Sequence, residues 1–152
     1  MTLFDSIISY LESRGLPYEI FHHRPVFTSD GAAELSDHPA AEGTKSLALQ
    51  SEHGLCVVTV CGDDRVDFAK LRAALGAKRI RMSNEQVLVQ EFGTEIGGLA
   101  PFGYPPNVPT LIAKRLFTQP HVYFNPGRND VTVRVVGDVF REIAVDHKAL
   151  LI

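Results

Sequence analysis

A lysine stands where its charge could do chemistry, at the start of the segment "TKSLAL". Polar and apolar residues alternate after Lys45, which predicts a strand with one buried face. Burying an ammonium group is unfavourable by several kcal/mol unless another group pairs with it. Two interpretations of Lys45 therefore stay open: a solvated end of the strand, or a cation that acts on a ligand.

A second candidate is the loop 95–109, "EIGGLAPFGYPPNVP", which is crowded with glycine and proline. Its GxxxP pattern comprises Gly97, Gly98, Leu99, Ala100 and Pro101. Paired glycines let the backbone approach a ligand closely and leave amide N–H groups free to meet oxygen atoms. The alternative interpretation is an ordinary turn-rich connection between regular elements.

The metal-ligating residue types show no such pattern. Cys56 and Cys61 are five residues apart, which fits neither a CxxC redox pair nor a zinc knuckle. The six histidines are scattered, without an HExxH motif or a partner set at ligand spacing. We therefore expect no metal site, and two reduced cysteines in the core.

Length and composition describe the molecule that carries these residues. The chain of 152 residues is about one domain long, and it is 45% hydrophobic and 22% charged. No stretch approaches the roughly 20 apolar residues that cross a bilayer. The start, "MTLFDSIISYLESRG", has no basic leader and predicts a helix rather than a signal peptide, so we expect a cytoplasmic protein. The net charge of −3 argues against strong phosphate-driven affinity for nucleic acid, although a local basic face could exist.

Hydrophobic periodicity and turn residues predict the elements that position the candidates. Asp67 is the expected N-cap of one helix, Thr28 or Ser29 of another, and Ser83 begins a capping-box pattern that ends at Gln86. Helices are predicted over 3–14, 28–37, 67–75, 87–92 and 138–144, and strands over 17–23, 44–50, 55–61, 78–83, 110–114, 121–125 and 131–135. Strands 44–50 and 55–61 should form a hairpin. Because helices and strands mix without strict alternation, we predict one α+β domain over 1–152 with a mixed, partly closed sheet.

Several motifs, in their order and spacing, resemble those of the YbaK and prolyl-tRNA editing-domain family of aminoacyl-tRNA deacylases. They are "HRPVFT", "TKSLAL", "DDRVDFAKLRAALGAKRIRM", "GGLAPFG" and "VYFNPGRND", which together span nearly the whole chain. The resemblance implies a YbaK-like barrel surrounded by helices. It also implies a free-standing enzyme without metal or organic cofactor that hydrolyses the ester between a small, wrongly attached amino acid and its tRNA, tRNA-Pro or a related one.

The resemblance also implies roles for individual residues. Lys45 matches a lysine required for activity, and it would either stabilise negative charge on the ester carbonyl or grip the terminal phosphate or ribose. Residues 97–101 match the loop that holds the terminal adenosine. The segment of Phe27 and Thr28 matches one that bounds the amino-acid pocket. We add Leu47 to this wall because it is a branched residue near Lys45. Asn125 matches a position at which alanine-editing relatives carry histidine, which puts alanine specificity in doubt.

Two other classes of function remain open. The chain could be a non-catalytic module that binds aminoacyl-tRNA or a nucleotide, or a protein that docks onto a synthetase. A basic run interleaved with acidic residues is either a solvated face or a contact with the phosphates of the tRNA acceptor stem. The expected partners are therefore the acceptor end of aminoacyl-tRNA and a synthetase, without a membrane. The basic residues of this run are Arg65, Lys70, Arg72, Lys78, Arg79 and Arg81.

Overall fold

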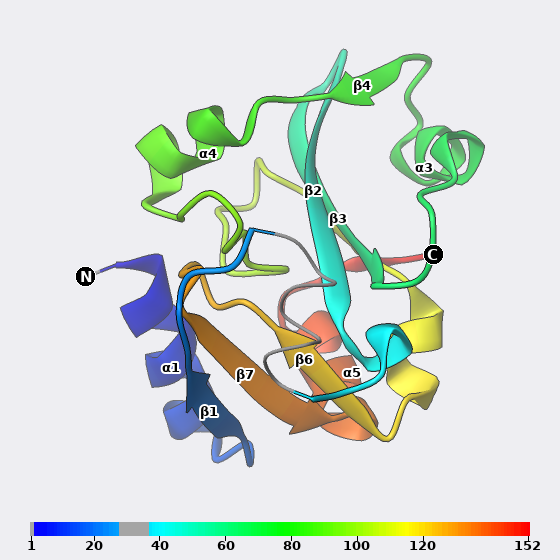
Figure 1. Ribbon diagram of the computed structural model, residues 1–152. Coiled ribbons are helices and arrows are strands. Elements are labelled where there is room, and N and C mark those ends of the chain that lie inside the picture. Colours follow the sequence, from blue (N-terminus) through cyan, green and yellow to red (C-terminus); the bar gives the residue numbers. More distant parts are fainter. Residues whose placement is uncertain (1, 28–36) are drawn as a thin grey trace.

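The computed structural model describes residues 2–27 and 37–152, which form a mixed α+β fold with two sheets (Figure 1). The helices are α1 (Leu3–Arg14), α3 (Phe68–Leu75), α4 (Glu85–Phe92) and α5 (Gly137–Asp146), with 3-10 turns at Ala40–Glu42 and Lys114–Thr118. The strands are β1 (Glu19–His22), β2 (Thr44–Ser51), β3 (Gly54–Cys61), β4 (Ile80–Met82), β5 (Thr110–Ile112), β6 (His121–Phe124), β7 (Val131–Val136) and β8 (Leu150–Leu151).

The two sheets differ in size and in strand direction. Three antiparallel strands form one sheet in the order β1-β7-β6. The other has the order β4-β2-β3-β5-β8, and its β3-β5 and β5-β8 pairs are parallel. A bridge between Gly43 and Tyr123 joins the sheets, and the Thr44 hydroxyl donates to the Tyr123 carbonyl at 3.0 Å. The predicted mixed α+β class is confirmed, whereas the partly closed barrel is not, because the contact between the sheets does not extend into a strand pair.

The hairpin of β2 and β3 has helices on both of its faces. Leu49 and Val58 pack with Leu71 of α3, and on the opposite face Ala48 packs with Leu88 of α4. Figure 1 shows α3 and α4 on either side of this hairpin. Alternate side chains of β2 point to opposite faces of the sheet. Because a helix covers each face, both sets of side chains are buried, as in a central strand.

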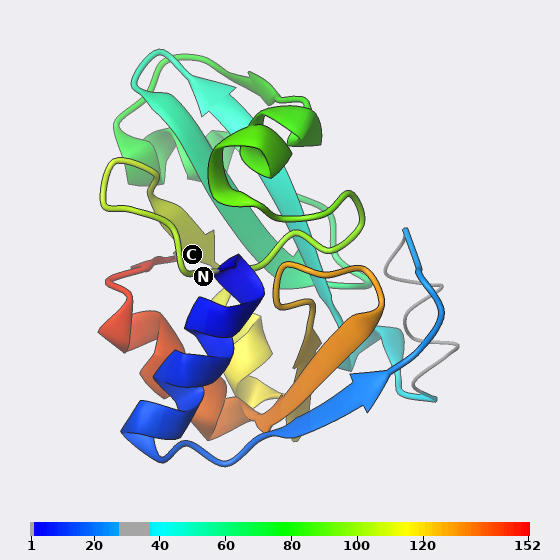
Figure 2. The ribbon, with the colours of Figure 1, turned by 90° about the vertical axis from the view of Figure 1, so that its left-hand side faces the viewer.

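Helices α1 and α5 lie side by side against the three-stranded sheet (Figure 2). Leu11 of α1 and Phe140 of α5 belong to the same buried cluster as Phe124 and Val133 of the sheet. This cluster is the hydrophobic core between the two helices and the three-stranded sheet.

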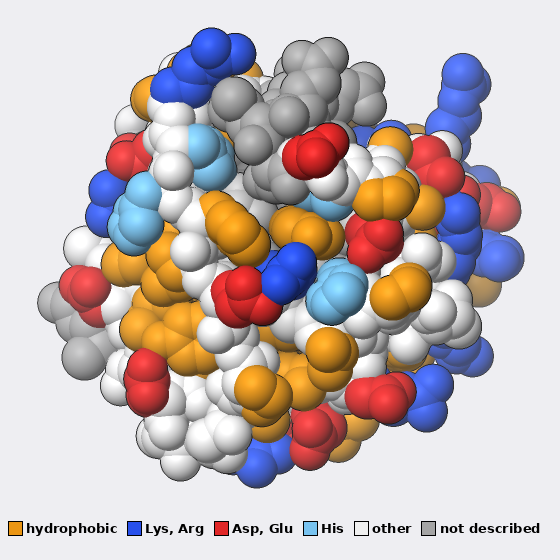
Figure 3. All heavy atoms as spheres, turned by 60° about the horizontal axis from the view of Figure 1, so that its bottom comes forward, with side chains coloured by type: hydrophobic (Ala, Val, Ile, Leu, Met, Phe, Trp, Pro, Cys, Tyr) orange, Lys and Arg blue, Asp and Glu red, His pale blue; other side chains and the backbone are white. Residues whose placement is uncertain are grey.

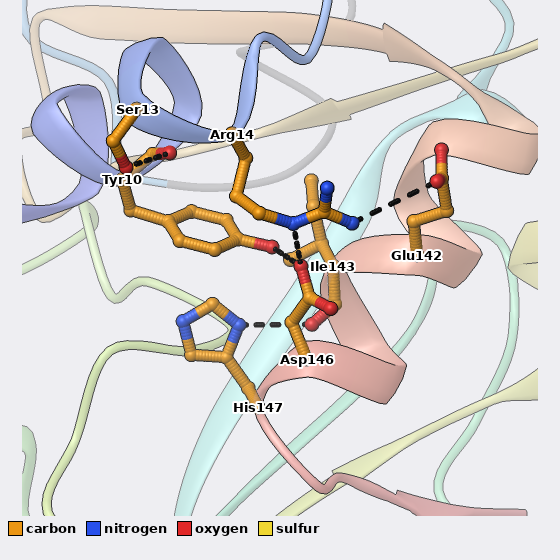
Figure 4. Close-up of polar contacts among 7 residues, drawn as sticks. All are labelled: Tyr10, Ser13, Arg14, Glu142, Ile143, Asp146 and His147. Atoms are coloured by element: carbon orange, nitrogen blue, oxygen red, sulfur yellow. Dashed lines mark hydrogen bonds and ion pairs between the residues drawn. The ribbon is translucent and has the colours of Figure 1, made fainter.

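Polar side chains also join the two helices (Figure 4). Asp146 of α5 accepts a hydrogen bond from the Tyr10 hydroxyl and one of 2.8 Å from Arg14 Nε. Arg14 Nη2 also lies 3.8 Å from a carboxylate oxygen of Glu142. We call Tyr10, Arg14 and Asp146 the α1–α5 clamp. The bonds from Arg14 and Tyr10 lower the pKa of Asp146, whereas burial and the Asp146 carboxylate raise the pKa of Tyr10.

The predicted helix ends are largely confirmed. Asp67 caps α3 by accepting from the amides of Ala69 and Lys70, and Gly15 ends α1 with a φ of 65°. The predicted cap of α4 is wrong by one residue, because Asn84 rather than Ser83 accepts from the Gln86 amide, at 2.9 Å. The 3-10 turn after β5 and the short strand β8 were not predicted. The predicted helix over 28–37, with its Thr28 or Ser29 cap, lies outside the described residues except for its last position.

Cys56 and Cys61 are buried and unpaired, as predicted. Burial raises the pKa of each thiol to about 11. None of the described helices has the length and apolar composition of a membrane span.

Candidate functional site

A cavity of about 330 Å³ opens where β2, the first turn of α4 and the glycine-rich loop meet. We call it the β2 pocket. It is lined by Phe27, Thr44, Lys45, Ser46, Leu47, Gly62, Glu85, Gly97, Leu99 and Asn125. The structure thus brings six residues predicted from the sequence to one cavity: Phe27, Lys45, Leu47, Gly97, Leu99 and Asn125.

The pocket lies along an open edge of β2. The strand pairs with β3 over its whole length but with β4 only at Leu49–Ser51. The last bond on the β4 side runs from the Ser83 amide to the Ala48 carbonyl, at 2.9 Å. Since backbone groups face alternate edges with a period of two, the N–H and C=O of Ser46 face this open edge. The edge position explains why consecutive residues from both faces of the strand line the pocket.

Two hydroxyl groups stabilise this end of the hairpin. Ser46 Oγ lies 2.8 Å from Thr59 Oγ1, and the two residues are cross-strand partners on β2 and β3. Thr59 is fully buried, so the bond satisfies a polar group that would otherwise be unpaired. The position of Ser46 beside Lys45 is therefore well determined.

Gly97 is held from two sides of the pocket. Its carbonyl accepts from Asn125 Nδ2 at 2.9 Å, and its amide donates to Glu85 Oε2 at 3.3 Å. Its φ is +81°, and a Cβ atom would lie 2.6 Å from the Val26 carbonyl oxygen and 2.8 Å from Phe27 Cα. Only glycine satisfies both the backbone conformation and this close approach.

Gly98 is required for a different reason. A Cβ atom there would lie 2.3 Å from the Arg128 carbonyl carbon, and the Gly98 amide donates to the Glu95 carbonyl at 2.9 Å. The amides of Gly97 and Gly98 are therefore both bonded within the protein. The expectation that these amides are free for a ligand is wrong.

The remaining residues of the GxxxP loop lie at different depths. Leu99 lines the pocket, whereas Ala100 and Pro101 are buried and the Ala100 carbonyl accepts from the Tyr104 hydroxyl at 2.7 Å. Gly98, Ala100 and Pro101 shape the loop and do not line the cavity. Their contact with a substrate stays a prediction.

Phe27 lies at the rim of the pocket. Its side chain is 65% exposed, and a Cβ atom on Gly97 would lie 3.1 Å from its ring. Its neighbour Val26 is buried in the core, so only Phe27 of these two apolar residues is at the rim. Thr28, the other predicted residue of this segment, lies outside the described residues.

The lining side chains carry one positive and one negative charge within the described part of the chain. Lys45 and Glu85 come from different segments, β2 and α4, and both are half-buried. Sequence reasoning missed Glu85, as it missed Thr44, Ser46 and Gly62. No local signal could have found Glu85, because its contact with Gly97 depends on the path of an irregular loop.

Within the described ranges, Cys61, Asp63 and Asp64 place potential metal ligands within 4.8 Å of one another. Arg115 Nη1 already lies 2.7 Å from Asp63 and 2.9 Å from Asp64, and the Arg115 bond lowers the pKa of Asp63. Burial raises the pKa of the Cys61 thiol to about 11, so a metal ion at this place would have to displace the thiol proton as well as Arg115. An arginine-centred ion-pair network accounts for this cluster.

Part of the basic run lies far from Lys45. Arg81 on β4 pairs with Gln50, five residues along β2 from Lys45, or roughly 17 Å at about 3.4 Å per residue. The amides of Lys78 and Arg79 donate to Glu52 and help to lower its pKa to about 2. Acidic and basic side chains are also mixed on the face at the bottom of Figure 1 (Figure 3). Among the described residues on the face that Figure 3 shows, the basic side chains do not form a continuous field.

Comparison with known proteins identifies a family. Residues 23–143 match the aminoacyl-tRNA editing domain. The chain is 35% identical over 78 residues to a proline--tRNA ligase of Thermosipho africanus, a match that covers 51% of this chain and 14% of the ligase. It is 31% identical over 110 residues to the ligase of Xanthomonas campestris pv. campestris, which covers 72% of this chain and 19% of the ligase. The matches thus span a small part of each ligase.

Solved structures share the fold along almost the whole chain. The crystal structure of hypothetical protein APE2540 has a TM-score of 0.82 at 23% identity and covers 95% of each chain. A structure described as a candidate trans-editing enzyme for prolyl tRNA synthetase has a TM-score of 0.81 at 21% identity and covers 100% of this chain and 96% of the other. At these identities the likeness is one of fold.

Proposed function

The chain belongs to the aminoacyl-tRNA editing domain family, and from this we propose that it hydrolyses the ester between a small, wrongly attached amino acid and tRNA. We propose further that it acts in trans, on tRNA that a synthetase has released, which is the activity ascribed to one structurally similar protein. The observation that carries the proposal is the convergence of Lys45, Gly97 and Asn125, from three separate motifs, on the β2 pocket.

The proposed reaction needs few catalytic groups. Water attacks the ester carbonyl, a tetrahedral oxyanion forms, and the ribose hydroxyl leaves with a proton. An aminoacyl ester is already labile, so the enzyme needs to hold it, admit one water molecule and stabilise the oxyanion. A cation and polar backbone groups at a strand edge are suited to this task.

Lys45 supplies the positive charge. Its ammonium either stabilises the developing oxyanion or holds the terminal phosphate or ribose of the tRNA. Both roles predict loss of turnover without loss of fold, because a half-buried lysine at the start of a strand contributes little to core packing.

The β2 pocket is small for a ligand site. Its volume of about 330 Å³ is at the lower end of small-molecule sites, which are about 300–1,000 Å³. Phe27 and Leu47 are proposed as the wall that excludes larger side chains by overlap, with Thr28 as a further part of the same segment. An editing site of this kind spares a larger cognate residue by size.

The proposal has consequences for partners and location. The acceptor end of aminoacyl-tRNA is the proposed substrate, and a synthetase that releases the mischarged tRNA is a proposed partner. Because aminoacyl-tRNA serves translation, we expect a cytoplasmic protein. The organisation as a single domain over 1–152 stays a prediction.

The test is release of labelled amino acid from a panel of mischarged tRNAs, with a chelator present. We expect deacylation of at least one small amino acid, unaffected by the chelator, because Lys45 and the loop supply the proposed chemistry. Activity that disappears with chelation and returns with zinc would contradict the cofactor-free reaction. Tight binding of aminoacyl-tRNA without release would favour the non-catalytic module, and co-migration with a synthetase without deacylation would favour the docking protein.

A further inference from the structure

Glu85 is an acidic residue in the β2 pocket that the reaction as described does not use. It is the first residue of α4, and its Oε2 atom accepts from the Gly97 amide at 3.3 Å. The Nδ2 atom of Asn125 donates to the carbonyl oxygen of the same Gly97, at 2.9 Å. Its hydrogen bond to Gly97 thus holds the Glu85 carboxylate at the wall of the cavity.

The Glu85 carboxylate has no cationic partner within residues 2–27 and 37–152. Among the described residues, neither Glu85 nor Lys45 takes part in an ion pair, although both line the pocket. Glu85 is half-buried, so its charge is partly removed from water. The α4 N-terminus and the Gly97 amide stabilise this charge, but one hydrogen bond leaves most of the acceptor capacity of a carboxylate unused.

The aminoacyl group has matching charges. Its α-ammonium is the positively charged group of a small aminoacyl ester, and its carbonyl develops negative charge during hydrolysis. An ammonium group is repelled by Lys45 and attracted by Glu85, whereas an oxyanion has the opposite preferences. The two charged side chains therefore define one orientation of the ester.

We propose that Glu85 forms a subsite for the α-ammonium group of the substrate and so restricts the reaction to aminoacyl-tRNAs with a free amino group. This inference rests on the proposed deacylase function and adds a substrate class to it. N-acylated esters, such as peptidyl-tRNA, lack the positive charge and place a bulkier group against the carboxylate. The subsite excludes them by charge and by size.

The first experiment compares Glu85→Gln with the wild-type protein on aminoacyl-tRNA and on its N-acetylated form. Glutamine keeps an oxygen that accepts from the Gly97 amide, so the change removes the charge and preserves the loop contact. We expect kcat/KM for the free-amine substrate to fall by about 10- to 100-fold. Hydrolysis of the N-acetylated substrate should be slow with both proteins and equal between them.

Glu91→Gln is the matched control, because Glu91 is an exposed carboxylate on the same helix, away from the pocket. It should behave as wild type on both substrates. The subsite is disproved if Glu85→Gln hydrolyses the free-amine substrate at the wild-type rate. It is equally disproved if the wild-type protein does not discriminate against the N-acetylated substrate.

A binding experiment separates this inference from the proposed hydrolysis. Calorimetry with an amide-linked, non-hydrolysable aminoacyl-adenosine measures the subsite whether or not the protein cleaves an ester. Wild-type protein should bind the free-amine form about 10-fold or more tightly than the N-acetyl form, and Glu85→Gln should bind both alike. Preference for the free amine without any deacylation would overturn the proposed function alone. Deacylation without this preference would overturn the subsite alone.

Discussion

The α1–α5 clamp and the β2 pocket both join charged side chains from segments far apart in the chain, but they differ in how the charges are satisfied. In the clamp, Arg14 and Tyr10 both donate to Asp146, so opposite charges meet directly. In the pocket, Lys45 and Glu85 line the same cavity without an ion pair in the part of the chain that the structure describes. Paired charges at the surface stabilise a fold modestly, whereas unpaired charges at a cavity are available to a ligand.

Backbone pairing differs between the two regions in the same way. Under the clamp, β7 has hydrogen-bonded neighbours on both sides, β1 and β6. At the pocket, β2 pairs with β4 only beyond Ala48 and leaves an edge at Ser46. Strand β7 is thus paired along both of its edges, whereas the β2 pocket lies where the pairing of β2 with β4 stops.

The largest effect is expected from Lys45→Ala. We predict a loss of deacylation of at least about 100-fold, because a charge is removed from the site where negative charge develops. The free energy of unfolding should change by less than about 0.5 kcal/mol. Single-turnover deacylation and urea denaturation measure the two quantities.

Lys114→Ala is the control for this change, because Lys114 is also a lysine but is exposed away from the pocket. Lys45→Arg should not restore the activity, since a planar guanidinium directs its donors differently from an ammonium. A folded Lys45→Ala protein with near-wild-type turnover would remove the assigned role of the cation.

Gly98→Ala should affect both the pocket and the stability. The new Cβ atom would meet the backbone of Arg128 and Asn129 within 2.6 Å, so the loop must move. We predict a loss of about 1–3 kcal/mol in the free energy of unfolding, together with reduced deacylation. Thermal denaturation and the deacylation assay on the same preparation measure both.

Gly76→Ala separates crowding from backbone strain. Gly76 ends α3 with a φ of +61°, and a Cβ atom there would meet no atom within 4 Å. It should lower stability by about 1 kcal/mol through its backbone conformation and leave deacylation unchanged. If Gly98→Ala is no more harmful than Gly76→Ala, the close packing of the loop is not required.

Phe27→Ala and Leu47→Ala test selectivity, a smaller effect. We expect each to raise deacylation of the larger substrates relative to the smaller ones by about 10-fold, because a wall that rejects by overlap is removed. The measurement is the rate on tRNAs charged with alanine, serine, threonine and proline. Val145→Ala, which shortens another exposed apolar side chain at a distance from the pocket, should keep the parental ranking. If both pocket variants keep that ranking, the side chains of Phe27 and Leu47 do not exclude the larger substrates.

Asp146→Asn should have the smallest effect, confined to stability. The folded pKa of Asp146 is lowered, so its stabilisation is present above the unfolded value of about 3.9 and disappears as the pH falls through the folded pKa. We predict a loss of about 1 kcal/mol at pH 7 that becomes smaller at an acidic pH below about 3.9, with deacylation at pH 7 unchanged.

Urea denaturation at both pH values tests the Asp146 prediction, with Glu91→Gln as the control for loss of an exposed carboxylate. An Asp146→Asn protein that is as stable as wild type at pH 7 would show that the clamp does not stabilise the fold. Reduced deacylation by this variant would show instead that the clamp and the pocket are coupled.

Local signals predicted most of the elements of this protein. Asp67 caps the start of α3 as predicted, and the predicted helices 3–14 and 87–92 end where Gly15 and Gly93 follow, because a cap involves only the adjacent turn. The β2–β3 hairpin was predicted because its strands are neighbours in the chain. The short strand β8 escaped notice, because it exists only through its pairing with β5, far away in the sequence.

The sequence by itself determined which residues could do chemistry: Lys45 in its strand, the glycines of the loop, and Asn125 in the motif before β7. Only the tertiary structure decided that the sheets remain two, that β2 keeps an open edge, and that Glu85 faces the same cavity as Lys45. The physical reason is the range of the interactions. Period and capping act within a few residues, whereas a pocket depends on where strand pairing stops and on how an irregular loop packs, neither of which a local pattern encodes.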